Sequence, residues 1–75
     1  MNRAELLAWL ETVPEDEPVF CMRAKDTAVP GAMRKYIARC ESLGSPKEHV
    51  DACKGFNKEI VDWRVANKKK CKVPD

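Results

Sequence analysis

Apolar side chains recur at helical spacing in three parts of the chain, and the first part follows Asn2. Asn2 can cap a helix whose third position is Glu5, close to a capping box. The apolar stripe of this stretch is Leu6, Leu7, Leu10 and Val13. Pro14 disfavours helical geometry just before it. The pattern therefore predicts a first helix that ends at about Val13.

The second helical stretch follows Asp26 and Thr27, whose side-chain oxygens can cap a helix, and Pro30 suits its first turn. Its apolar stripe is Met33, Tyr36, Ile37, Cys40 and Leu43. Gly44 follows the stripe at the position where a left-handed residue commonly ends a helix. We therefore expect the second helix to end there.

The third helical stretch has the strongest start signal: Ser45 as the cap, Pro46 at the first position and Glu48 at the third. Its expected inner face, in a helix that runs to about Ala66, is Val50, Cys53, Phe56, Ile60 and Trp63. Gly55 inside this helix costs roughly 1 kcal/mol relative to alanine. It therefore predicts a close approach of the second helix or of the segment before it.

Residues 18–26, P-V-F-C-M-R-A-K-D, form an apolar run without helical spacing, which predicts an extended strap across the core. No other run is an evident partner strand, so the strap either bonds to loops and water or pairs with the same segment of a second protomer. The expected fold is mainly α, a compact three-helix domain (residues 1–67) with this strap between helices one and two, and a mobile basic tail (residues 68–75). The residues expected to meet in its core are Leu6, Leu10, Phe20, Met33, Ile37, Phe56 and Ile60.

Charge is unevenly distributed over the 75 residues, which are enough for one small domain. Residues 1–22 carry one base and five acids, whereas residues 23–75 carry thirteen bases and seven acids. Such polarity can steer a charged partner or favour antiparallel self-association, or it can reflect two solvated faces. Monomer and homodimer both remain open.

No apolar run approaches the roughly 20 residues of a membrane span, and the N-terminus lacks the pattern of a secretory signal.

Four cysteines and one histidine are the candidates for chemistry. The intervals between Cys21, Cys40, Cys53 and Cys71 are 19, 13 and 18 residues, without the close pairs of zinc sites. This favours core cysteines over a metal site or disulfides, except that Cys71, among lysines, is expected to be exposed and reactive. His49 is expected at the surface. Without a phosphate loop or nucleophile motif, the sequence predicts no catalytic residue, metal or cofactor, and hence no enzyme.

Charged clusters are the remaining candidates for partner binding. They are the acidic turn Glu15, Asp16 and Glu17, the strap residues Arg23 and Lys25, and the tail lysines Lys68, Lys69, Lys70 and Lys72. One hypothesis is a protein-interaction module that uses a helix face, the acidic turn or the tail. The other is a nucleic-acid binder in which the tail lysines, with Arg64, Lys58 and Lys54, contact phosphates.

Residues 17–26 read E-P-V-F-C-M-R-A-K-D, residues 28–36 read A-V-P-G-A-M-R-K-Y, and the chain closes in K-V-P-D. With Trp63, this pattern resembles a group of small uncharacterised bacteriophage and prophage proteins over most of residues 16–75. Val29 stands where that group has alanine, and Cys21 where an aliphatic residue is expected, which favours a buried thiol. The resemblance implies a phage origin, a location in the host bacterial cytoplasm and, with the features above, a host protein as partner.

Overall fold

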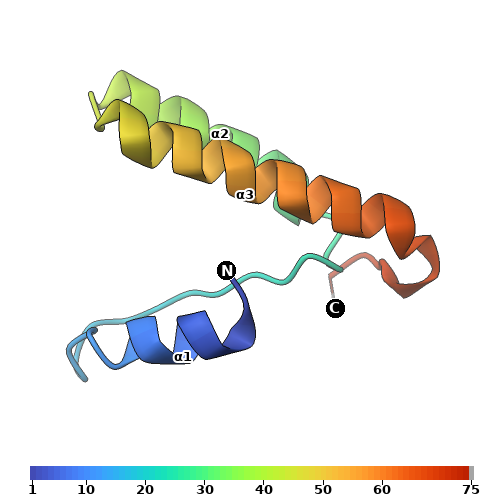
Figure 1. Cartoon of the computed structure of the whole chain (residues 1–75), viewed down its shortest axis with the longest axis horizontal. Coiled ribbons are helices and arrows are strands. Elements are labelled where there is room, and N and C mark those ends of the chain that lie inside the picture. Colours follow the sequence, from blue (N-terminus) through green and yellow to red (C-terminus); the bar gives the residue numbers. More distant parts are fainter. Residues whose placement is uncertain (75) are drawn as a thin grey trace.

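The computed structural model describes residues 1–74 and contains three α-helices (Figure 1). They are α1 (Arg3–Leu10), α2 (Val29–Ser42) and α3 (Lys47–Ala66), followed by the short 3-10 helix η1 (Lys68–Lys70). An extended strap joins α1 to α2, and no β-strand occurs among the described residues. The predicted mainly α architecture of three helices and a strap is confirmed. None of the helices within residues 1–74 combines the length and apolarity needed to cross a bilayer.

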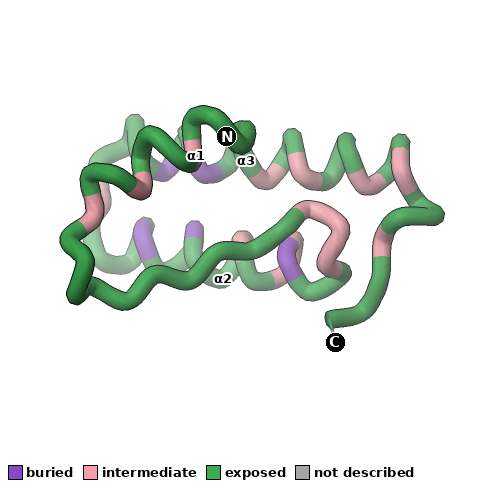
Figure 2. Tube along the Cα trace, turned by 90° about the horizontal axis from the view of Figure 1, so that it is seen from below, coloured by how far each residue is buried: buried purple, intermediate pink, exposed green. Residues whose placement is uncertain are grey.

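Helices α2 and α3 lie side by side as an antiparallel hairpin that contains the buried core (Figures 1 and 2). Four buried side chains form this core, with Met33 packed against them: Ile37, Cys40, Val50 and Cys53. Cys40 and Cys53 are therefore core residues, as predicted. Both cysteines lie on apolar stripes where a small hydrophobic side chain lets two helices approach.

The turn of the hairpin is built around Gly44, whose φ of 77° is the left-handed conformation predicted for it. The Gly44 amide donates to the Glu41 carbonyl (3.1 Å) and the Ser45 amide to the Cys40 carbonyl (3.0 Å), which is a Schellman motif. Ser45 does not cap α3, because Pro46 occupies the cap position without a side-chain bond. The predicted close approach at Gly55 is also wrong, since a Cβ there would meet nothing within 4 Å.

Asn2 caps α1 as predicted, whereas the cap residue of α2 is Ala28 and not the predicted Asp26 or Thr27. Asn2 Oδ1 accepts a hydrogen bond from the Glu5 amide (2.9 Å), as the capping pattern predicted. Asp26 Oδ1 accepts one from the Ala28 amide (2.8 Å) and turns the chain into α2. α1 ends at Leu10, and residues 11–13 form a turn instead of the predicted last helical residues.

The N-terminal helix and the strap contribute less to the core than predicted. α1 buries no residue, Leu6 and Leu10 are only half-buried, and the Phe20 side chain is 85% exposed. Phe56 on α3 is 40% exposed. The prediction that these residues meet in one core is wrong, because α2 and α3 already cover each other's apolar stripes. The strap carries α1 away from that interface (Figure 1).

The C-terminal segment folds back onto the end of the strap instead of extending freely. The Lys72 amide donates to the Lys25 carbonyl (3.0 Å), and the Thr27 amide donates to the Lys72 carbonyl (2.9 Å). Asp26 and Lys72 thus form an isolated parallel bridge. This differs from the predicted free tail; its last residue, Asp75, lies outside the described residues. The strap thus bonds to a loop, which was one of the two predicted alternatives, although the C-terminal segment was not predicted as its partner.

Candidate partner-binding site

The fold brings the basic strap residues and one tail lysine together around Trp63. Arg23, Lys25 and Lys70 line a shallow depression with Ala24 and the indole of Trp63. The backbone bridge at Lys72 explains this arrangement, because it holds the residues after η1 against the strap. Arg23, Lys25, Lys70 and Trp63 are called the basic cluster below. Three of the predicted candidate residues therefore belong to one surface.

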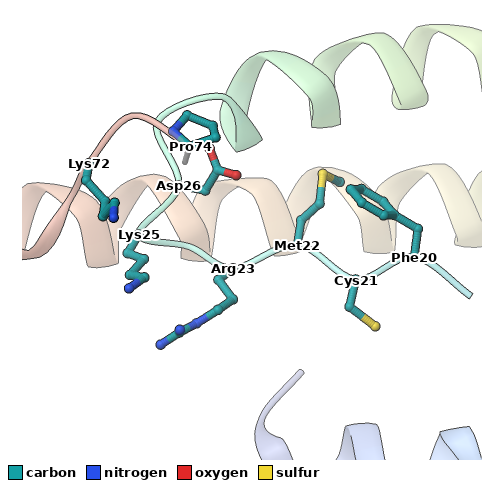
Figure 3. A pocket seen from close by; sticks show the side chains of 8 residues that line it. All are labelled: Phe20, Cys21, Met22, Arg23, Lys25, Asp26, Lys72 and Pro74. Atoms are coloured by element: carbon teal, nitrogen blue, oxygen red, sulfur yellow. The ribbon is translucent and has the colours of Figure 1, made fainter.

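A second depression lies between the strap and the C-terminal segment (Figure 3). The Phe20 and Met22 side chains point to one side of the strap, and those of Cys21 and Arg23 point to the other. This alternation is that of extended backbone. Lys72 and Pro74 close the far end of the depression, beside Lys25 and Asp26.

An apolar groove adjoins the basic cluster. Its volume is about 600 Å³, and its apolar lining residues come from the N-terminus, the strap, α2 and α3: Met1, Met22, Ala24, Met33, Phe56, Ile60 and Trp63. Asn2 and Glu59 add polar atoms. Methionine is common at surfaces that adapt to a partner, because its unbranched side chain fits varied shapes. Trp63 lines both the groove and the basic cluster, so the two are continuous.

Two of the basic residues assigned to phosphate binding in the nucleic-acid hypothesis have structural partners instead. Arg64 donates from Nη1 to the Ala24 carbonyl (3.0 Å) and from Nη2 to Thr27 Oγ1 (3.3 Å). Lys58 Nζ lies 2.7 Å from Asp62 Oδ2. Arg64 thus fixes the end of the strap to α3, which orients the basic cluster without belonging to it.

The acidic turn lies at the far end of α1 from the basic cluster (Figure 1). Glu15, Asp16 and Glu17 are all exposed, as are Lys68 and Lys69 on η1. The structure therefore divides the predicted candidate residues into an acidic end and a basic end. The basic end adjoins the apolar groove.

His49 has two partners that its sequence context did not predict. Its Nε2 lies 3.2 Å from Tyr36 Oη and 3.6 Å from Cys53 Sγ, and the Tyr36 and His49 rings meet edge to face at 6.1 Å. The spacing of His49 and Cys53, four residues apart on one helix, was the available signal. This cluster joins α2 to α3 near the turn.

The chemistry of this cluster is that of a structural contact. Burial raises the pKa of the Cys53 thiol, and the neighbouring Cys40 raises it further. The Cys40 side chain also raises the pKa of the Tyr36 hydroxyl. Because both pKa values are raised, the Cys53 thiol and the Tyr36 hydroxyl stay protonated near neutral pH. A nucleophilic cysteine needs a lowered pKa instead.

The other two cysteines differ from their predictions. Cys21 is exposed on the strap, so the expected buried thiol is wrong there. Cys71 is half-buried, and its Sγ lies 3.5 Å from the Asn67 carbonyl oxygen, which differs from the exposed thiol predicted. Within residues 1–74, no three cysteine, histidine or acidic side chains are grouped as metal ligands, and all four cysteines are free.

Comparison with known proteins adds no family: no family model, no curated protein and no solved structure matches the chain.

Proposed function

We propose that this chain is a small phage-encoded protein that binds and modulates a host protein in the bacterial cytoplasm, without catalysis. The observation that carries the proposal is the apolar groove continuous with the basic cluster through Trp63. Interfaces are typically anchored by exposed aromatic and methionine side chains with arginine near them. The partner that fits is an acidic amphipathic helix. Its apolar side would enter the groove, and its carboxylates would meet Arg23, Lys25 and Lys70.

A direct test uses an amphipathic peptide with leucine at helical spacing and glutamate on its other face. Trp63 fluorescence in a Trp9→Phe background would report binding, because Trp63 lines the groove. We expect Lys70→Glu to weaken binding severalfold, whereas Lys54→Glu, an equal charge change on an exposed lysine outside the groove, should leave it unchanged. Equal losses of peptide affinity in both variants would show that binding depends on the overall charge of the chain and not on the proposed site.

Nucleic-acid binding is the second candidate, because Trp63 between basic side chains could stack a base while the lysines contact phosphates. A single-stranded oligonucleotide, titrated in the same fluorescence assay, separates the two. Tight binding of the oligonucleotide that falls steeply with salt, without binding of the acidic peptide, would favour this candidate. A pulldown from host lysate with nuclease present should retain one protein species if the first proposal holds.

A further inference from the structure

The strap is extended over residues 18–23 and presents an open backbone edge over residues 18–22. Among the described residues, no hydrogen bond joins the N–H or C=O groups of residues 18–22 to another group. Val19 and Phe20 favour strand geometry. An exposed strand edge with such side chains is a template for pairing with another chain. We propose that residues 17–23 pair antiparallel with the same segment of a second copy of this chain.

The exposed surface of the chain is large enough to accommodate such a contact. A monomer of 8.5 kDa is expected to expose about 4,650 Å², whereas this chain exposes 6254 Å². Its radius of gyration, 13.6 Å, exceeds the roughly 11.3 Å of a globular domain of this length. A standard interface buries about 800 Å² of each partner. The excess surface therefore exceeds what one such interface would cover.

The charges at the two ends of the segment fit a two-fold axis through Phe20. In this register Phe20 lies opposite Phe20 of the second copy, Val19 opposite Cys21, and Glu17 opposite Arg23. The register therefore forms two ion pairs, one at each end of the paired segment. Phe20 is the most exposed large apolar side chain in the described part of the chain, and pairing would place it against an aromatic ring.

The face of the strap that carries Phe20 also favours this pairing. Phe20 and Met22 point to the same side (Figure 3), and in extended backbone Pro18 belongs to that side as well. In the antiparallel register Pro18 lies opposite Met22 of the second copy. Two copies would thus form one apolar surface around the axis. This inference goes beyond the proposed function: the pairing would engage Arg23 and Met22, and it leaves Phe56, Trp63, Lys25 and Lys70 open to a host protein.

The first test is a charge exchange measured on the whole chain by sedimentation over a concentration series. The parent should reach twice its 8.5 kDa mass. Glu17→Lys and Arg23→Glu should each weaken the dimer about tenfold, because each variant alone places like charges opposite each other twice. An equimolar mixture of the two variants should restore the parent affinity, as should the double variant. The control Lys35→Glu, on an exposed face of α2, should have no effect.

The second test is crosslinking with diamide. Val19→Cys should form interchain disulfides with Cys21 of the second copy, whereas the double variant Val19→Cys with Cys21→Ser should form few. Retained helicity by circular dichroism would show that each variant is folded. A chain that stays monomeric up to millimolar concentration overturns the proposal. So does a dimer that Glu17→Lys and Arg23→Glu leave unchanged, because another face would then hold it together.

Discussion

The α2–α3 hairpin and the arm formed by α1 and the strap carry similar apolar residues, yet only the hairpin buries them well. Ile37 and Val50 are at most 7% exposed, whereas Phe20 in the arm is 85% exposed. Within the arm, Leu6 and Leu10 reach only partial burial. Apolar composition alone therefore does not decide which segment forms a core.

The difference follows from length and connection. α2 and α3 have 14 and 20 residues and are joined by a short turn, so closing the hairpin costs little entropy and aligns two long stripes. α1 has eight residues, a length at which a helix gains little stability by itself. It is separated from the hairpin by the extended strap. Its apolar side chains therefore remain available for contacts outside the chain.

The largest effect should come from truncating the hairpin core. Ile37→Ala should lower the free energy of unfolding by about 2 to 5 kcal/mol, because it removes buried methyl groups and leaves a cavity. Leu6→Ala in the arm should cost less than about 1 kcal/mol. Urea unfolding followed by circular dichroism measures both. The comparison fails if Leu6→Ala is as destabilising as Ile37→Ala.

A smaller effect should come from detaching the strap from α3. Arg64→Met keeps much of the side chain's length but loses the hydrogen bonds to the Ala24 carbonyl and Thr27 Oγ1, at a cost of about 1 to 2 kcal/mol. We expect hydrogen exchange to accelerate at the Thr27 and Lys72 amides, which form the bridge to the C-terminal segment. The Cys40 amide in the hairpin should not change.

Arg34→Met serves as the control, because this substitution removes the same charge from an exposed position on α2. Faster exchange throughout α2 and α3 in Arg64→Met would show instead that strap and hairpin unfold as one unit. Faster exchange confined to the Thr27 and Lys72 amides would show that Arg64 holds the strap locally and is not needed for the hairpin core.

The smallest effect should come from the exposed ion pair of Lys47 and Asp51, whose atoms Nζ and Oδ2 are 2.7 Å apart. The hydrogen bond from Lys47 lowers the pKa of Asp51. The stabilisation by this ion pair is therefore present above the pKa of aspartate in the unfolded chain. It is lost as pH falls through the lowered pKa of Asp51 in the folded chain. Asp51→Asn should reduce the melting temperature slightly at neutral pH and not at all once the parent carboxyl is protonated.

Glu59→Gln removes the same charge from α3 without breaking this pair and is the matched control. A large loss in Asp51→Asn at neutral pH would mean that the hairpin depends on surface charge as well as on its core.

The sequence by itself determined the local elements of this protein. Helical spacing located α2 and α3, Asn2 marked the start of α1, and Gly44 marked the turn, because each signal depends on neighbours a few residues apart. Cys40 and Cys53 were assigned to the core for the same reason: they lie on the helical stripes. The helix positions and the turn are local signals, whereas the burial of the two cysteines is completed by the packing of α2 on α3.

Only the tertiary structure decided how the strap and the tail are used. The bridge at Lys72 is made of backbone hydrogen bonds, which any residue except proline can form, and Arg64 reaches a carbonyl forty residues away. No residue pattern encodes such contacts. The same contacts bring Arg23, Lys25 and Lys70 to Trp63 and leave Phe20 exposed. The candidate site thus depends on long-range backbone pairing, because that pairing sets which charged and apolar groups become neighbours.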